Sequence, residues 1–293
     1  MQDREERLRR GVAAFALFRT QRGIDRALRA GGLEPQIDEF WRSERTETWT
    51  VARETLEALL ELGVDVCSYD CPEYPAALRS SPTPLPLFFL LGGCRGLEEP
   101  AVGMCGSRSA SAEALEAART CGMEVARHGL CVVSGYARGV DTETHLGALK
   151  AGGSTTVVLA EGILHFRPKR VFRDLNFSSD RLTVVSQFAP WQRWHVGAAM
   201  TRNATIASLG RALVVVEAGE TGGTLNAARQ ALAMRRPVLA LEFGTRMTPP
   251  GNLTLFEEGA IPIRNRNQLI RVLKHIHETP RDEALVADQL VLL

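Results

Sequence analysis

The feature that most constrains the fold of this chain is a series of short apolar runs, separated by helical stretches, that begins near residue 100. Each run is rich in Val, Leu and Ala and does not alternate with polar residues, which indicates strands buried on both faces of a sheet. Strands and helices that alternate in this way predict an α/β fold with a doubly wound, mainly parallel Rossmann-like sheet. The expected strands cover 101–105, 130–134, 155–160, 182–186, 212–217 and 238–241.

The residues on either side of this series predict further parts. Apolar positions recur at helical spacing up to about residue 64, and a short strand-like run follows at 64–67. Prolines between Pro75 and Pro86 cannot continue a helix, so this stretch leads into the apolar run at 87–91. We therefore expect a small helical N-terminal region (1–70), a proline-rich lead-in (71–98), a Rossmann domain (99–265) and a C-terminal helix and tail (266–293).

The charge balance limits the kinds of partner that the chain can bind. The formal net charge is only +1, so a nucleic-acid site must be a local basic patch rather than a property of the whole surface. Only three of the 35 basic residues are lysines. A planar guanidinium grips phosphate and stacks on bases, so the excess of arginine suits nucleic acid. A GC-rich genome would produce the same excess without any function.

The cysteines and the N-terminus bear on cofactors and location. The six cysteines include no C-x-x-C pair, so we expect no metal site and no disulfide framework. The N-terminus is too charged for a signal peptide, and no apolar stretch reaches membrane-spanning length. We expect a cytoplasmic protein that holds no metal or cofactor and does not bind a membrane.

Ligands of a doubly wound sheet bind beyond the carboxyl ends of its strands, so the turns there are the candidate site. The first turn is Gly106, Ser107, Arg108 and Ser109, which is not a G-x-G-x-x-G dinucleotide fingerprint. Its small residues let the backbone approach a phosphate at a helix N-terminus, and Arg108 adds charge-assisted hydrogen bonds. The alternative is a simple helix cap beside a surface arginine.

The second turn places two glycines around an arginine. Its candidate binding residues are Ser134, Gly135, Arg138 and Gly139. Asp141 can cap the next helix, and His145 lies one helical turn further on. A histidine there could serve in acid–base chemistry, but a capping aspartate with a nearby polar histidine is the commoner arrangement.

Two more regions beyond strand ends carry suitable side chains. The segment from Trp191 to Asn203 interleaves tryptophans with arginines, which suits base stacking, unless at least one tryptophan packs in the core. Glycines and threonines at 221–224 predict an anion-binding nest at a helix start. The candidates from these regions and from the last turn are Arg202, Asn203, Thr221, Gly222, Gly223, Thr224, Gly251 and Asn252.

The order of these motifs resembles a known family. Ser-Gly-x-Ala-Arg-Gly-Val-Asp at 134–141, with His145 four residues later, is similar to the signature of the DprA/Smf family of DNA-processing proteins. The flanking motifs follow in the family order over roughly residues 70 to 265. They are Tyr74-Pro75, Gly106-Ser107-Arg108, Arg202-Asn203, Glu217 with Thr221-Gly222-Gly223-Thr224, and Gly251-Asn252 before Gly259-Ala260.

The resemblance implies a protein that binds and loads DNA and catalyses nothing. Members of that family bind single-stranded DNA in a basic pocket of the Rossmann domain, form homodimers and hand the strand to a RecA-type recombinase. It also implies that Arg108 contacts phosphate. We expect Arg108 to be the surest DNA contact, then Arg202, and Arg138 last because Asp141 could pair with it.

This chain departs from the family pattern at several points. Lys169 and Arg170, which we include among the DNA-binding candidates, belong to a segment that replaces the usual Tyr-Pro after the third strand. The second arginine after Arg202-Asn203 is missing, and Phe243-Gly244 replaces a Pro-Gly. The N-terminal region does not clearly match the family's small helical module, and residues 266–293 are too few for a winged helix. These departures indicate a divergent paralogue.

Two other functions remain open from the sequence. One is a DNA-sensing or antitoxin component of a phage-defence system, with a toxin as partner. The other is a nucleotide-binding enzyme similar to phosphoribohydrolases, which place a glutamate after a Gly-Gly-x-Gly-Thr turn. Here no acid follows Thr221 to Asn226, so Glu217 and Glu220 are the only carboxylates that such chemistry could use.

Overall fold

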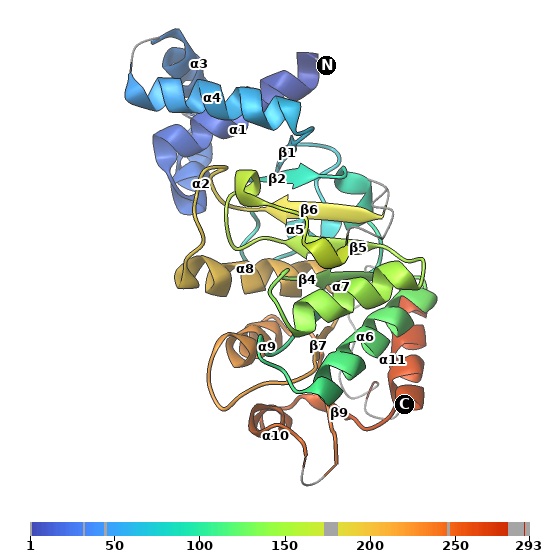
Figure 1. Ribbon diagram of the computed structural model, residues 1–293. Helices are drawn as coiled ribbons and strands as arrows, with labels where there is room; N and C mark the ends of the chain where they lie inside the picture. The colour runs from blue at the N-terminus through green and yellow to red at the C-terminus, as the bar shows by residue number, and fades with distance from the viewer. Residues whose placement is uncertain are drawn as a thin grey trace.

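The computed structural model describes residues 2–31, 33–43, 46–172, 181–244, 247–280 and 290 (Figure 1). Its centre is one nine-stranded sheet with the strand order β1-β2-β6-β5-β4-β3-β7-β8-β9. All strand pairs from β6 to β9 are parallel, whereas β1 pairs antiparallel with β2, and β2 with β6. The predicted doubly wound, mainly parallel sheet is confirmed.

The apolar runs of the sequence become the strands of this sheet. The six strands expected after residue 100 are all present, and three more join them. The bounds are β1 Asp65–Ser68, β2 Leu87–Leu91, β3 Ala101–Cys105, β4 Cys131–Ser134, β5 Thr155–Val158, β6 Leu182–Ser186, β7 Leu213–Val215, β8 Val238–Leu241 and β9 Ile261–Ile263. The sequence did not predict β9, because an Ile-Pro-Ile stretch of three residues carries no strand pattern.

Helices cover both faces of the sheet and bury its apolar side chains. Val102 and Met104 point to one face, where they pack with α6 (Ala112–Arg127), α7 (Val140–Lys150) and α11 (Arg266–Glu278). Ala101 and Cys105 point to the other face, which is covered by four helices. These are α5 (Ala76–Arg79), α8 (Val196–Leu209), α9 (Gly223–Ala233) and α10 (Pro250–Glu257). Three 3-10 turns complete the elements, η1 (Cys94–Leu97), η2 (Ile163–His165) and η3 (Arg170–Phe172).

The N-terminal region is helical as predicted and lies at the β1–β2 end of the sheet (Figure 1). Its helices bury a common core with Val66, Phe89 and Val184 from the sheet, and the rings of Phe15 and Phe89 lie 5.9 Å apart. The bounds are α1 Gln2–Phe18, α2 Gln21–Arg29, α3 Leu33–Arg42 and α4 Glu47–Glu61.

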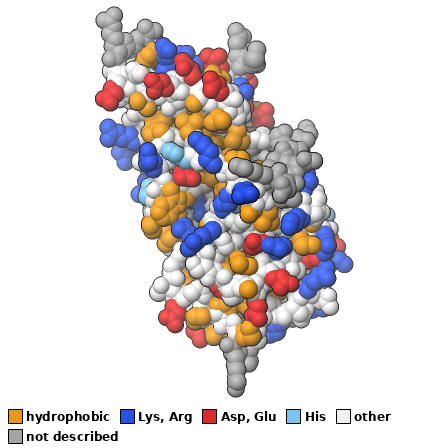
Figure 2. Space-filling model, in the orientation of Figure 1, with side chains coloured by type: hydrophobic (Ala, Val, Ile, Leu, Met, Phe, Trp, Pro, Cys, Tyr) orange, Lys and Arg blue, Asp and Glu red, His pale blue; other side chains and the backbone are white. Residues whose placement is uncertain are grey.

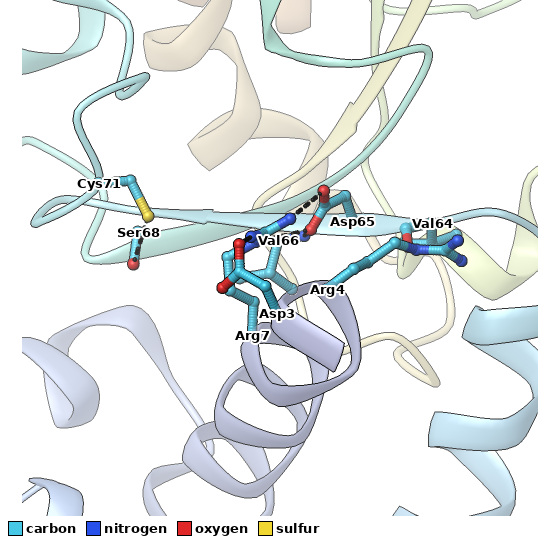
Figure 3. A network of polar contacts seen from close by, with 8 residues as sticks. All are labelled: Asp3, Arg4, Arg7, Val64, Asp65, Val66, Ser68 and Cys71. Carbon is cyan, nitrogen blue, oxygen red and sulfur yellow. Dashed lines mark hydrogen bonds and ion pairs between the residues drawn. The ribbon is translucent and has the colours of Figure 1, made fainter. Parts of the chain in front are cut away.

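Polar contacts of the first helix fix this region to the sheet (Figure 3). The Arg4 guanidinium donates to the carbonyl oxygens of Leu60 and Val64, each at 2.9 Å. Arg7 lies between Asp3 and Asp65 at 2.6 Å from each carboxylate, and Asp65 begins β1. Both guanidiniums thus direct N–H donors to oxygen atoms of the protein itself, which stabilises the contact between α1 and the segment that leads into β1.

The described residues provide no membrane-spanning helix, metal cluster or disulfide. In the described part of the chain, no helix has the length and apolar character needed to cross a membrane. No group of three or more His, Cys, Asp or Glu side chains in that part could hold a metal ion. The five cysteines whose side chains the structure describes form no disulfide, and burial raises the pKa of the Cys131 thiol to about 11.

Candidate nucleic-acid interface

Two adjacent cavities lie along the carboxyl ends of the central strands. The larger, of about 470 Å³, opens beyond the ends of β3 and β7, where the chain reverses its direction of travel across the sheet. Such reversal points are where doubly wound sheets bind ligands. The smaller cavity, of about 270 Å³, lies beyond the ends of β4 and β5. Arg108, Trp194 and Arg202 line both cavities and form the boundary between them.

The turn after β3 presents Arg108 to solvent. The Ser107 amide donates to the Glu217 carbonyl at 2.8 Å, and the Ser109 amide donates to the Ser107 hydroxyl at 3.1 Å. This bonding fixes the turn, and the exposed Arg108 guanidinium lies 5.3 Å from the centre of the Trp194 ring. All four residues predicted for this turn, Gly106 to Ser109, line the larger cavity.

The two tryptophans of the 191–195 segment have different surroundings. Trp191 is half-buried against the core shared with the N-terminal helices. Trp194 is 45% exposed and lines both cavities. Trp191 thus packs partly against the core, whereas the exposed Trp194 ring, beside Arg108, can be offered to a ligand.

The turn after β4 has an unusual backbone. Tyr136 has a φ of 61°, a conformation that is strained for a bulky side chain, and Gly139 has a φ of 80°. The Asp141 carboxylate accepts from the Ala137 amide at 3.2 Å. Arg138 is exposed, and no hydrogen bond or ion pair joins its side chain to another described residue. The alternative that Asp141 pairs with Arg138 and only braces the turn is therefore not what the structure has.

Arg202, on α8, is the most unusual side chain of the site. It is only 5% exposed, yet its Nε and Nη1 atoms have no hydrogen-bond partner among the described residues. Burial lowers the pKa of the guanidinium, although the nearby Asp141 opposes this shift. The guanidinium fits only because residue 135 is glycine, since a Cβ there would lie 1.5 Å from Arg202 Nη1. Buried donors without partners are rare, so this group is suited to an anionic ligand.

The helix start at α9 completes the larger cavity. Thr221, Gly223 and Thr224 line it, and the intervening Gly222 has a φ of 111°. The side-chain amide of Asn203 donates to the Gly223 carbonyl at 3.3 Å and so connects α8 to this turn. The N-terminus of this helix, with its free amides and positive dipole, favours an anion.

Lys169 and Arg170 do not join this group. The Lys169 ammonium donates to the carbonyl oxygens of Tyr136 and Ala137, at 2.6 and 3.1 Å, and to the Thr142 hydroxyl at 2.8 Å. Burial lowers the pKa of Lys169, opposed by Asp141. Arg170 is exposed on η3 and lines neither cavity. Lys169 therefore holds the strained β4 turn in place.

Three more predicted residues stabilise the turns at this edge from buried positions. The Ser134 hydroxyl is buried and donates to the Met104 carbonyl at 2.7 Å. The Asn252 side chain, also fully buried, accepts from the Ala218 amide at 2.9 Å and donates to the carbonyl oxygens of Val216 and Leu241. Gly251 lies so close to Gly219 that a Cβ would be 2.2 Å from its carbonyl oxygen. These residues shape the turns and do not face the cavities.

Two groups that could suggest catalysis, His145 and Glu217, are buried or already hydrogen-bonded. His145 is 1% exposed with Nδ1 2.7 Å from the Thr155 hydroxyl, and burial lowers its pKa to about 3. The Glu217 carboxylate accepts from the amide and the hydroxyl of Ser111, at 3.1 and 2.9 Å, and so holds the residue that caps the start of α6.

Charge is distributed unevenly over one face of the molecule. In Figure 2, acidic side chains gather over the N-terminal helices at the top, whereas basic and hydrophobic side chains gather over the middle of the face. A local basic area on a chain of net charge +1 is the arrangement that the composition requires for nucleic acid.

Sequence reasoning did not select Tyr136 or Glu161, which both line the smaller cavity. Tyr136 stacks on Phe172 with ring centres 5.6 Å apart, and Glu161 follows β5. Glu161 stands at the carboxyl end of a predicted strand, so its position could have marked it. No motif singles it out.

The chain is similar to known proteins over most of its length. A family model described as DNA recombination-mediator protein A matches residues 65–274. DNA processing protein DprA of Bacillus subtilis is 27% identical over 252 residues, which are 84% of this chain and 81% of that protein. Protein Smf of Synechocystis is 30% identical over 210 residues, 70% of this chain and 52% of that protein, so the matched part spans about half of its length.

Two solved structures share the fold. One is DNA processing protein A from Streptococcus pneumoniae, with a TM-score of 0.65 and 22% identity over 89% of this chain and 93% of that chain. The other is DNA processing protein A from Helicobacter pylori, for which a single-stranded DNA binding mode has been described. It has a TM-score of 0.63 and 21% identity over 72% of this chain and 95% of that chain.

Proposed function

The chain belongs to the DNA recombination-mediator protein A family, and we propose that it binds single-stranded DNA along the carboxyl edge of its sheet. The observation that carries the proposal is the buried Arg202 guanidinium with two donor groups unpaired. Exposed Arg108 and Arg138 line the cavities beside it, and neither makes an ion pair with a described residue. Three guanidiniums at one edge suit a phosphate backbone, because each can donate charge-assisted hydrogen bonds to phosphate oxygens.

The aromatic and backbone groups of the edge support the same ligand. Trp194 is exposed between the two cavities, where a base of a single strand could stack on its ring. The turn at Thr221 to Thr224 and the start of α9 offer amides to a phosphate. A duplex hides its base faces, so an exposed ring favours the single-stranded form.

Fluorescence anisotropy with a labelled single-stranded oligonucleotide tests this proposal. Affinity should fall steeply as salt rises, because phosphate contacts release counterions. A variant with Arg108, Arg138 and Arg202 all changed to alanine should lose binding. The matched control changes the exposed Arg26, Arg235 and Arg271 to alanine, which removes the same charge outside both cavities. If the wild type does not bind at low salt, or if both variants weaken binding equally, the site is not here.

We further propose that the protein acts as a homodimer and delivers bound DNA to a RecA-type recombinase. This part rests on the family and on the resemblance of the motifs. Co-sedimentation of a RecA-type recombinase with the DNA-bound protein, and analytical ultracentrifugation of the protein alone, would test the two statements separately. A role in phage defence with a toxin partner would instead give DNA binding without recombinase loading.

That the protein catalyses no reaction stays a prediction. The hydrogen bonds from Ser111 already occupy the Glu217 carboxylate, which counts against the phosphoribohydrolase alternative. Incubation with nucleoside monophosphates tests that alternative directly. Release of a free base, lost when Glu217 is changed to glutamine, would contradict the binding-only interpretation.

A further inference from the structure

The smaller cavity is lined by side chains of opposite charge that form no ion pair with one another. It is lined by three arginines and one carboxylate, among backbone and apolar groups. The lining charged residues are Arg108, Arg138, Glu161 and Arg202. No ion pair or hydrogen bond joins the Glu161 carboxylate to any of the described residues, and only its backbone carbonyl is used, as acceptor for the Ser186 hydroxyl at 2.6 Å.

The backbone holds Glu161 firmly at this position. The next residue, Gly162, donates its amide to the Gln192 carbonyl at 2.8 Å. A Cβ at Gly162 would lie 2.2 Å from the carbonyl oxygens of both Ala189 and Pro190, so the chain is tightly packed there. Glu161 is itself only half-exposed. A half-buried carboxylate without a partner among the described residues, carried on a tightly packed backbone, is available to accept hydrogen bonds from a ligand.

The cavity therefore complements a ligand that carries both an anion and N–H donors. The unpaired Nε and Nη1 atoms of Arg202 suit the anion, and the acceptor-only Glu161 carboxylate suits the donors. A nucleotide has both features, since its phosphate is the anion and its base edge supplies the donors. The exposed Trp194 ring at the cavity wall can stack on the base.

The bases differ in how well they satisfy a carboxylate. Guanine presents two adjacent donors, N1–H and the 2-amino group, which match the two oxygens of a carboxylate. Adenine and cytosine present one amino group beside a ring nitrogen that repels a carboxylate. Thymine presents one N–H between two carbonyl oxygens. Paired hydrogen bonds to a base edge are the contacts that discriminate one base from another.

We propose that the smaller cavity is a base subsite that prefers guanine, with Glu161 as the residue that determines the preference. The proposal rests on single-stranded DNA binding at this edge and adds base selectivity to it. It contrasts with the weak sequence preference expected when phosphate contacts alone supply the affinity.

Anisotropy with oligonucleotides about 15 nucleotides long measures the preference. The strands repeat TTG, TTA or TT-inosine, and a thymine-only strand is the reference, all in lithium buffer to prevent guanine quadruplexes. The wild type should bind the TTG strand about tenfold more tightly than the TTA strand. Inosine, which lacks the 2-amino group, should lose most of that advantage.

Two variants separate recognition from simple charge. Glu161→Gln should abolish the ratio between the TTG and TTA strands. Glu116→Gln removes the same charge from the exposed side of α6 and should leave the ratio unchanged. Circular dichroism melting checks that both variants are folded.

The outcomes distinguish this proposal from the one on which it rests. Equal binding of all four strands by the wild type overturns the guanine subsite and leaves DNA binding intact. A Glu161→Gln variant that tightens all strands by the same factor means that Glu161 only repels phosphate, which also overturns the subsite. No binding of any strand by the wild type overturns both proposals.

Discussion

The arginines at the N-terminal helices and those at the sheet edge have opposite surroundings. Arg4 and Arg7 bind carbonyl and carboxylate oxygens that belong to the same chain. At the sheet edge, Arg138 has no such partner among the described residues, and Arg202 keeps two unpaired nitrogen atoms although it is buried. Arginines thus stabilise the fold in the N-terminal region, whereas at the sheet edge their N–H donors are available to a ligand. The cost of burying N–H donors without hydrogen-bond partners points to a ligand that supplies acceptors.

The largest effect should come from Arg202→Met, which keeps an unbranched side chain and removes the charge. We expect DNA binding to weaken by about 3 kcal/mol, roughly a hundredfold, because a charge-assisted contact in a desolvated site is lost. Melting temperature should not fall, because an unpaired buried guanidinium costs free energy in the free protein. Anisotropy and differential scanning calorimetry measure the two effects.

A fall in melting temperature for Arg202→Met would contradict the contrast between the N-terminal arginines and those at the sheet edge. It would mean that the Arg202 guanidinium contributes to the stability of the free fold, as the N-terminal arginines do. The result would then favour its electrostatic interaction with Asp141 as its main role.

The next largest effect should come from Lys169→Met, since this cation lies at the edge but is bonded like the N-terminal arginines. Three hydrogen-bond acceptors would lose their donor, so we expect the free energy of unfolding to fall by about 2 kcal/mol. Urea denaturation measures the loss. If Lys169→Met instead leaves stability unchanged and lowers the slope of log affinity against log salt by about one contact, Lys169 contacts DNA directly.

Arg108→Ala should have a smaller effect, confined to binding. Its guanidinium is exposed, so we expect affinity to fall by about 1.5 kcal/mol and melting temperature to hold. The slope of log affinity against log salt should decrease by about one contact. Titrations at several salt concentrations measure the slope. A loss of affinity with an unchanged slope would assign Arg108 to positioning of the Trp194 ring.

Arg7→Ala should have the smallest effect, and of the opposite kind. Removal of the contacts to Asp3 and Asp65 should lower the free energy of unfolding by about 1 kcal/mol, while DNA affinity stays as in the wild type. Urea denaturation and anisotropy on one preparation compare the two. Weakened binding with unchanged stability would place DNA at the N-terminal region as well.

The sequence predicted most of the sheet because its strands are buried on both faces and therefore read as continuous apolar runs. The alternation of strand and helix also predicted that the turns after the strands lie at one edge of the sheet. The sequence did not predict that β1 and β2 extend the sheet beyond β6, because antiparallel pairing across a proline-rich segment leaves no local pattern. It also missed β9, where the middle residue is Pro262.

The candidate site was predicted less well, because side-chain direction is not encoded in a motif. Ser134, Lys169 and Asn252 stand in the right turns, yet their polar groups bond to neighbouring backbone atoms. The expected order of importance also changes. The sequence ranks Arg108 above Arg202, whereas burial and the missing partners of Arg202 give it the larger expected effect.

The close approach of Gly135 to Arg202 has a consequence for how this chain can evolve. A single methyl group at position 135 would occupy the space of the guanidinium, so Gly135 cannot gain a side chain while Arg202 is kept. The residue allowed at position 135 therefore depends on a residue that lies 67 positions further along the chain. A descendant that abandons the ligand should lose the arginine first, and only then can the glycine drift.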